Sequence, residues 1–180
     1  NPEPNDTVAT TTINGYAGTT YYILVDTDDD GDTGGGYSLT ISNEGAIPPG
    51  DVCGDPLTAS DGLNTGGDTS VAENDYDDAT CEMAGGGPDQ IWEYVATASG
   101  TLEVEMDSTG YDQFRCTLSA RSTCLTVGTE LGCENDGADD DNGICTITFD
   151  VVSGQTYYIL AETNNPGLMG GEYDLTLSYP

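Results

Sequence analysis

The sequence predicts an all-β protein built from two packed antiparallel sheets. Short segments alternate apolar and polar residues, and turn-forming Ser and Gly residues separate them. No long stretch shows the helical period of about 3.6 residues together with capping residues. Alternation buries one face of a strand and leaves the other in water, which is typical of antiparallel sheets. The expected fold is therefore an antiparallel β-sandwich.

Five segments carry the strand pattern most clearly. Segment 90–96 (QIWEYVA) comes first, and 101–106 alternates Leu, Val and Met with Thr and Glu. Segment 146–151 repeats that alternation with Ile, Phe and Val facing one way. Segment 157–161 is continuously apolar, as expected for a central strand, and 173–178 closes the series with a further alternation.

An internal repeat organises the chain. Residues 18–42 recur at residues 154–178 without a gap, and 14 of the 25 aligned positions are identical. A repeat sets the architectural unit, yet only its second copy follows a long segment of its own. We therefore expect a partial unit over 1–44, a Pro-rich linker over 45–50 (GAIPPG) and a complete sandwich over 51–180.

Residues 17–42 are expected to form an N-terminal β-hairpin around an acidic loop. A lone hairpin is marginal in water, so its apolar faces need a cover. The complete unit of the same chain could cover them, or a neighbouring chain could do so. Alternatively, the front of the first unit was removed by processing, and 1–44 is a fragment of that unit. We favour a neighbouring chain, because an unpaired hairpin offers sheet edges for strand addition.

The charge balance is extreme. The chain has 33 Asp and Glu residues against two Arg, with neither Lys nor His, which gives a net charge of −31. Nucleic acid and anionic membrane surfaces are excluded as partners because both require basic side chains, and no apolar run is long enough to insert into a bilayer. A compact chain with this charge repels itself unless cations screen or bridge it. Specific calcium sites and an acidic surface adapted to salt both remain open.

The six cysteines predict disulfides. They lie outside CxxC spacing and no His accompanies them, which argues against zinc and for an oxidising compartment. Of the fifteen pairings that six cysteines allow, we favour Cys53–Cys81, Cys124–Cys133 and Cys116–Cys145. In the last pair, both cysteines are in phase with inward-facing residues of their strands.

Six pieces of the second unit occur in a characteristic order. They are DVCGDPLTAS, GGGPDQIWEYVATASGTLEVEM, LSARSTC, ELGCENDG, TITFDVVSGQTYYILAET and GGEYDLTLS. In this order they resemble the bacterial pre-peptidase C-terminal domain family. EPNDT at residues 3–7 is similar to a start motif of such domains, but the first unit lacks the middle that should follow. The resemblance implies a secreted, non-catalytic, jelly-roll-like sandwich associated with matrix or substrate binding and often with calcium. The cysteines at 116 and 145 are additions to the family pattern.

Two acidic segments are candidate calcium sites. Asp26, Asp28, Asp30 and Asp32 reproduce the first half of an EF-hand loop, but position twelve is Tyr37, so the prediction is a calcium loop between strands. The second segment, 134–142, supplies Asn135, Asp136, Asp139 and Asp141, and the family resemblance adds Asp112. Solvated acidic turns are the alternative for both segments. A third acidic run at 74–78 is expected to be an exposed loop.

Enzyme chemistry finds little support. Without His or Lys there is no Ser-His-Asp triad, HExxH zinc site or Schiff-base lysine. A carboxylate pair for glycoside hydrolysis carries no weight among 33 acids. We expect an extracellular or cell-surface structural protein: a calcium-stabilised subunit of a filament or surface layer, joined to other copies of itself through the N-terminal hairpin. The alternative is an accessory module of a secreted peptidase or other exoenzyme, binding a matrix protein or polysaccharide.

Overall fold

The computed structural model describes residues 10–11, 13, 20–25, 36–42, 47–76, 79–81, 86–108, 115–124, 128–136, 143–164 and 170–180. The chain divides into two compact units, Asn1–Ile47 and Pro48–Pro180. This boundary falls inside the segment expected as a linker, and the end of that segment is part of the second unit. The carbonyl of Pro49 accepts a hydrogen bond from Gln90 Nε2, and the carbonyl of Gly50 accepts one from the Ile91 amide.

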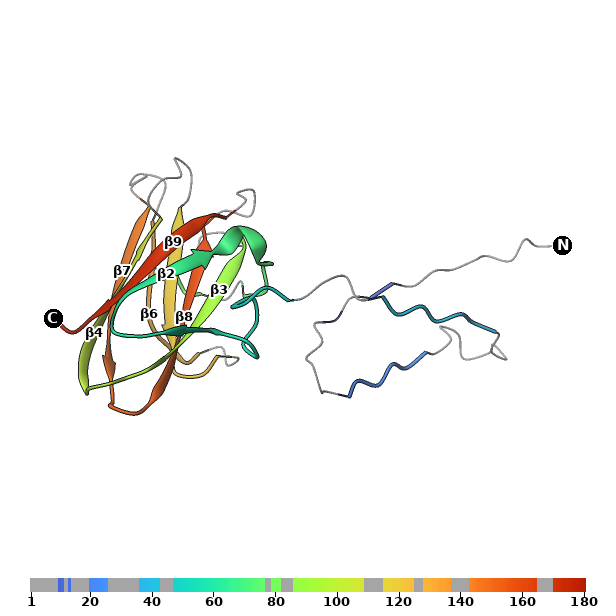
Figure 1. Cartoon of the computed structure of the whole chain (residues 1–180), viewed down its shortest axis with the longest axis horizontal. Coiled ribbons are helices and arrows are strands. Elements are labelled where there is room, and N and C mark those ends of the chain that lie inside the picture. Colours follow the sequence, from blue (N-terminus) through green and yellow to red (C-terminus); the bar gives the residue numbers. More distant parts are fainter. Residues whose placement is uncertain are drawn as a thin grey trace. The chain divides into compact units, whose positions relative to one another are not determined.

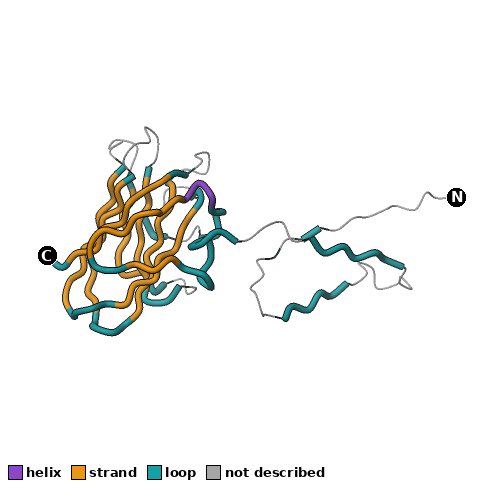
Figure 2. The backbone as a smooth tube through the Cα atoms, viewed as in Figure 1, coloured by secondary structure: helices purple, strands orange, loops and turns teal. Residues whose placement is uncertain are grey.

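The second unit is a β-sandwich, as the sequence predicted. The described part of the chain contains β1 (Leu57–Ala59), β2 (Gly62–Asp68), a 3-10 turn (Thr69–Val71), β3 (Asp89–Val95), β4 (Gly100–Asp107), β5 (Cys116–Arg121), β6 (Glu130–Asn135), β7 (Ile144–Val151), β8 (Thr156–Thr163) and β9 (Glu172–Ser178). One sheet has the order β1-β3-β8-β5-β6 and the other β2-β9-β4-β7. Figures 1 and 2 show these two sheets packed face to face. Neighbouring strands are antiparallel except β1 and β3, which run parallel.

The core lies between the sheets and comes from alternate residues. Leu102, Val104 and Met106 of β4 are fully buried, and Ile147 and Phe149 of β7 pack in the same cluster. Burying one such side chain stabilises the fold by about 1.5–3 kcal/mol. A one-residue slip of register would turn all of them to solvent, so the alternation that predicted these strands also fixes their pairing.

Three disulfides tie the sandwich together: Cys53–Cys124, Cys81–Cys133 and Cys116–Cys145. The predicted Cys116–Cys145 bond is confirmed, and it joins β5 to β7 across the two sheets.

The other two expected pairings, Cys53–Cys81 and Cys124–Cys133, are wrong. Ile91 of β3 and Leu160 of β8 form a small apolar cluster with Cys124, and Cys53 packs against it. Both strands turn their alternate residues into the main core, so this cluster covers the opposite face of the five-stranded sheet. Packing over that face, rather than separation in sequence, decides the pairing.

The N-terminal hairpin expected over 17–42 is not formed among the described residues of the first unit. Residues 20–25 and 36–42 are drawn as loop in Figure 2, and no strand is assigned to them. Their repeat counterparts give the physical reason. β8 lies between β3 and β5, whereas β9 lies between β2 and β4 in the other sheet. The two strands of this repeat therefore pair with different sheets and not with each other.

Candidate functional site

The acidic positions predicted as calcium ligands fall mostly outside the described residues. Asp26, Asp28, Asp30, Asp32, Asp112, Asp139 and Asp141 lie there. Asn135 and Asp136, at the end of β6, are described, and both side chains bind within the protein. Asn135 Nδ2 donates to Thr117 Oγ1 at 3.0 Å, and Asp136 Oδ2 accepts from the Gly143 amide at 3.1 Å. The second contact holds residues 136 and 143 together.

A pair of buried acids, which sequence reasoning missed, lies at one end of the five-stranded sheet. Asp89 of β3 and Glu162 of β8 are direct cross-strand partners, exposed by 0% and 3%. Directly opposite residues have Cβ atoms about 4.5–5.5 Å apart, so two carboxyl groups share one dry face. The carboxyl of Glu162 lies against Gly86, where any side chain would overlap it.

Hydrogen bonds satisfy only part of Asp89. Its Oδ2 accepts from the amides of Asp75 and Tyr76 at 2.9 and 3.1 Å, whereas its Oδ1 is buried without a hydrogen-bond partner. Burial, and to a smaller extent the charges of Asp75 and Asp51, raises the pKa of Asp89 to about 7, against the effect of the two amides. The acidic run at 74–78, expected only as an exposed loop, therefore supplies backbone donors to this group.

The buried pair can be relieved by a proton or by a cation. A buried carboxylate without a partner is strongly unfavourable, and an opposite charge within about 4–6 Å lowers its pKa again. Calcium prefers carboxylate and carbonyl oxygens and takes six to eight of them, so the unpartnered Oδ1 of Asp89 fits such an ion. Among the described residues, however, no three or more acids, Cys or His gather as metal ligands.

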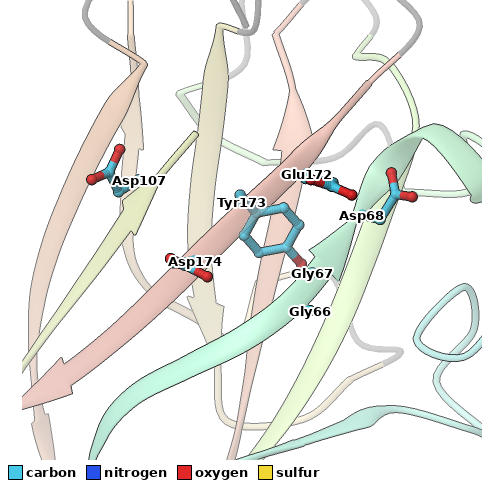
Figure 3. A pocket seen from close by; sticks show the side chains of 7 residues that line it. All are labelled: Gly66, Gly67, Asp68, Asp107, Glu172, Tyr173 and Asp174. Atoms are coloured by element: carbon cyan, nitrogen blue, oxygen red, sulfur yellow. The ribbon is translucent and has the colours of Figure 1, made fainter. Parts of the chain in front are cut away.

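A second acidic feature lies on the four-stranded sheet (Figure 3). A hollow of about 440 Å³ is lined by Gly66, Gly67, Asp68, Asp107, Glu172, Tyr173 and Asp174. Its four acids form two like-charged cross-strand pairs, Asp68 with Glu172 and Asp107 with Asp174. Like charges directly opposite each other destabilise a sheet, and β9 contributes one member of each pair.

The repeated segment is uncovered in the first unit. Tyr21, Ile23 and Val25 are 41%, 49% and 50% exposed, whereas their counterparts in β8 are at most 7% exposed. Tyr37, Leu39 and Ile41 are 68%, 53% and 75% exposed, whereas their counterparts in β9 are at most 3% exposed. A segment that is identical at 14 of 25 positions is therefore buried in the core of one unit and exposed in the other.

These features define the class: a strongly acidic, disulfide-bonded, two-sheet β-sandwich with an uncovered duplicate of two of its strands. No family model matches the chain, and no curated protein matches it either. In the described residues, no helix is long and apolar enough to span a membrane.

Solved structures similar to the chain include a pre-peptidase C-terminal domain, the family that the sequence resembles. This domain of a Bacillus anthracis collagenase is 9% identical, with a TM-score of 0.40, over 68% of this chain and 94% of the domain. CorA, a surface-associated copper-binding protein of Methylomicrobium album BG8, is 8% identical, with a TM-score of 0.45, over 69% and 98%. A family 35 carbohydrate-binding module from an environmental isolate is 13% identical, with a TM-score of 0.36, over 76% and 90%.

Proposed function

We propose that the protein is a non-catalytic extracellular structural protein, a calcium-stabilised sandwich subunit of a self-assembling filament or surface layer. One observation carries this proposal: side chains that are buried in β8 and β9 are exposed in the duplicate segment of the first unit. Large exposed apolar patches on soluble proteins mark interaction surfaces. In an assembly, a neighbouring copy covers residues 20–25 and 36–42.

The cross-links suit a role outside the cell. The sandwich contains three disulfides. Disulfides persist in oxidising compartments and are rare in the cytosol. They also limit unfolding where no cellular machinery refolds a damaged subunit.

Calcium would bind beside Asp89 and Glu162, and at the acidic segments 26–32 and 134–142. At the buried pair, the ion would supply positive charge beside Asp89, whose pKa is otherwise raised to about 7, mainly by burial. Asp89 Oδ1 and the carboxyl of Glu162 would hold it, and backbone carbonyls or water would complete its shell.

Sedimentation velocity of the oxidised chain, in calcium and then in EDTA at fixed ionic strength, tests this function. We expect polymers in calcium that become smaller in EDTA. A double variant, Ile23→Asp with Leu39→Asp, should stay monomeric, because it places charge on the faces that need cover. Polymers indifferent to EDTA would remove calcium from the contacts. A monomer in both buffers would contradict self-assembly and favour the accessory module that binds a matrix protein or polysaccharide.

A further inference from the structure

We propose that residues 20–25 and 36–42 of one copy enter a second copy, where they occupy the positions of β8 and β9. This inference rests on the proposed function and states how the copies join. We call β1–β7 the frame, residues 20–25 and 36–42 the N-terminal pair, and β8 with β9 the C-terminal pair. The two positions lie inside different sheets, since β8 contacts β3 and β5 and β9 contacts β2 and β4.

The N-terminal pair keeps the side chains that the frame is shaped to receive. Tyr21 and Ile23 align with Tyr157 and Ile159, which point into the main core from β8. In β9, Leu175 is fully buried, and its aligned residue is Leu39. At these three positions the interior of the frame would therefore meet the same side chains from either pair, whereas Val25 would replace Ala161 and Ile41 would replace Leu177.

The most specific feature of the frame is the place of Tyr173. Its ring lies over Gly67, where any side chain would collide with it, and its hydroxyl accepts a hydrogen bond from Trp92 Nε1 at 2.7 Å. The hydroxyl also donates to Gln90 Oε1 at 3.1 Å. Tyr37 aligns with Tyr173, so the N-terminal pair brings the one aromatic residue that this place requires.

The two pairs differ in charge, and the difference favours the N-terminal pair. Glu172 and Asp174 of β9 face Asp68 and Asp107 of the frame in two like-charged cross-strand pairs (Figure 3). The aligned residues of the N-terminal pair are Gly36 and Ser38, which carry no charge. Exchange therefore removes both repulsions and leaves the more acidic strand, which water solvates more readily, outside the frame.

The covalent cross-links leave this exchange open. All six cysteines belong to the frame or its loops, and none lies in β8 or β9. Each copy has one frame and two pairs, so the charge difference decides which pair occupies the frame as the chain folds. A pair passed from each copy to the next makes a head-to-tail contact, which generates an open fibre when it does not close into a ring.

Cross-linking between two versions of the full chain tests the register. Thr176 of β9 lies opposite Glu105 of β4, and Thr40 aligns with Thr176. One version carries Thr40→Cys and the other Glu105→Cys. They are mixed, unfolded in denaturant at acidic pH with the native disulfides intact, refolded together and mildly oxidised. We expect a linked dimer on a non-reducing gel.

The matched control replaces Glu105→Cys by Thr148→Cys. Thr148 lies on β7, which borders β4 and is separated from β9 by that strand, so this pair should stay unlinked. Linkage through position 148 instead of 105 would mean addition at a sheet edge and would overturn the proposal. An internal link in a single chain that carries both Thr40→Cys and Glu105→Cys would overturn it too, because the segment would then occupy its own frame.

The charge argument has its own variants. Ser38→Asp restores the repulsion opposite Asp107 and should lower the yield of linked dimer about two- to five-fold. Asp174→Ser in the receiving chain makes its own β9 the better occupant and should lower the yield by a similar factor; unchanged yields would overturn the role of charge. If sedimentation shows polymers but the gel shows no linked dimer, strand exchange is refuted and the proposed function is not. If sedimentation shows only monomers, the proposed function itself is refuted.

Discussion

Asp89→Asn should remove a pH dependence of stability that the natural protein shows in EDTA. Burial raises the pKa of Asp89 to about 7 in the folded state, against about 3.9 for an unfolded Asp. Between these values the folded state holds a proton that the unfolded state releases, so the free energy of unfolding falls as pH rises. The difference of about three pKa units corresponds to a loss of up to about 4 kcal/mol from pH 4 to pH 7.

Urea unfolding at a series of pH values measures this loss. Trp92 is the only tryptophan and is buried in the core, so its fluorescence reports on the sandwich. We expect the natural chain to lose stability from pH 4 to pH 7 and to level off above, whereas Asp89→Asn shows a much smaller change. Asp150→Asn, at an exposed position of β7, is the control and should keep the loss.

Calcium adds a second arm to this experiment. If the ion binds beside Asp89, added calcium stabilises the ionised carboxylate and should offset the loss near pH 7 in the natural chain but not in Asp89→Asn. A natural chain whose stability is flat from pH 4 to pH 7 in EDTA would refute the reasoning about burial. A calcium effect of equal size in both chains would place the ion elsewhere.

Two further perturbations test the fold and the uncovered segment. Leu175→Ala should destabilise the sandwich by about 2–5 kcal/mol because the side chain is fully buried. Leu39→Ala, at the aligned exposed position, should leave the urea unfolding of the monomer unchanged. Equal effects of the two substitutions would mean that Leu39 is covered within its own chain. Replacing Cys116 and Cys145 together by Ser should lower the free energy of unfolding by about 3–4 kcal/mol, because the loop between them spans 29 residues. An unchanged urea midpoint would show that packing alone closes that side of the sandwich.

Strand periodicity predicted those parts of the fold in which apolar residues alternate. The alternation over 101–106 and 146–151 became β4 and β7, which are paired along their length. β2 gave no such signal, because two of its inward positions are occupied by Asn64 and Gly67. Asn64 is buried but donates to the carbonyls of Ser60, Gly62 and Leu175. The position of this strand is determined by these hydrogen bonds and by the Tyr173 ring of β9, which lies over Gly67. Neither interaction produces a periodic pattern in the sequence.

The candidate site was harder to predict than the fold for a similar reason. Asp89 and Glu162 are 73 residues apart in a chain with 33 acids, and nothing in their neighbourhoods marks them. Only the register of β3 against β8 places them opposite each other. Two of the three disulfide predictions were wrong for the same reason: the sequence allows fifteen pairings, and packing on the outer face of β3 and β8 accompanies Cys53–Cys124.

The repeat shows both the strength and the limit of sequence evidence. Alignment alone reveals that residues 18–42 duplicate 154–178, but it treats the change from Ser38 to Asp174 as one mismatch among several. The register of β9 against β4 shows that this mismatch affects stability, because Asp174 lies opposite Asp107 and the two acids repel each other. The same holds for the change from Gly36 to Glu172, because Glu172 faces Asp68. A frame bounded by acids prefers the uncharged pair, so the segment left uncovered in the first unit is the one that better fits a neighbour.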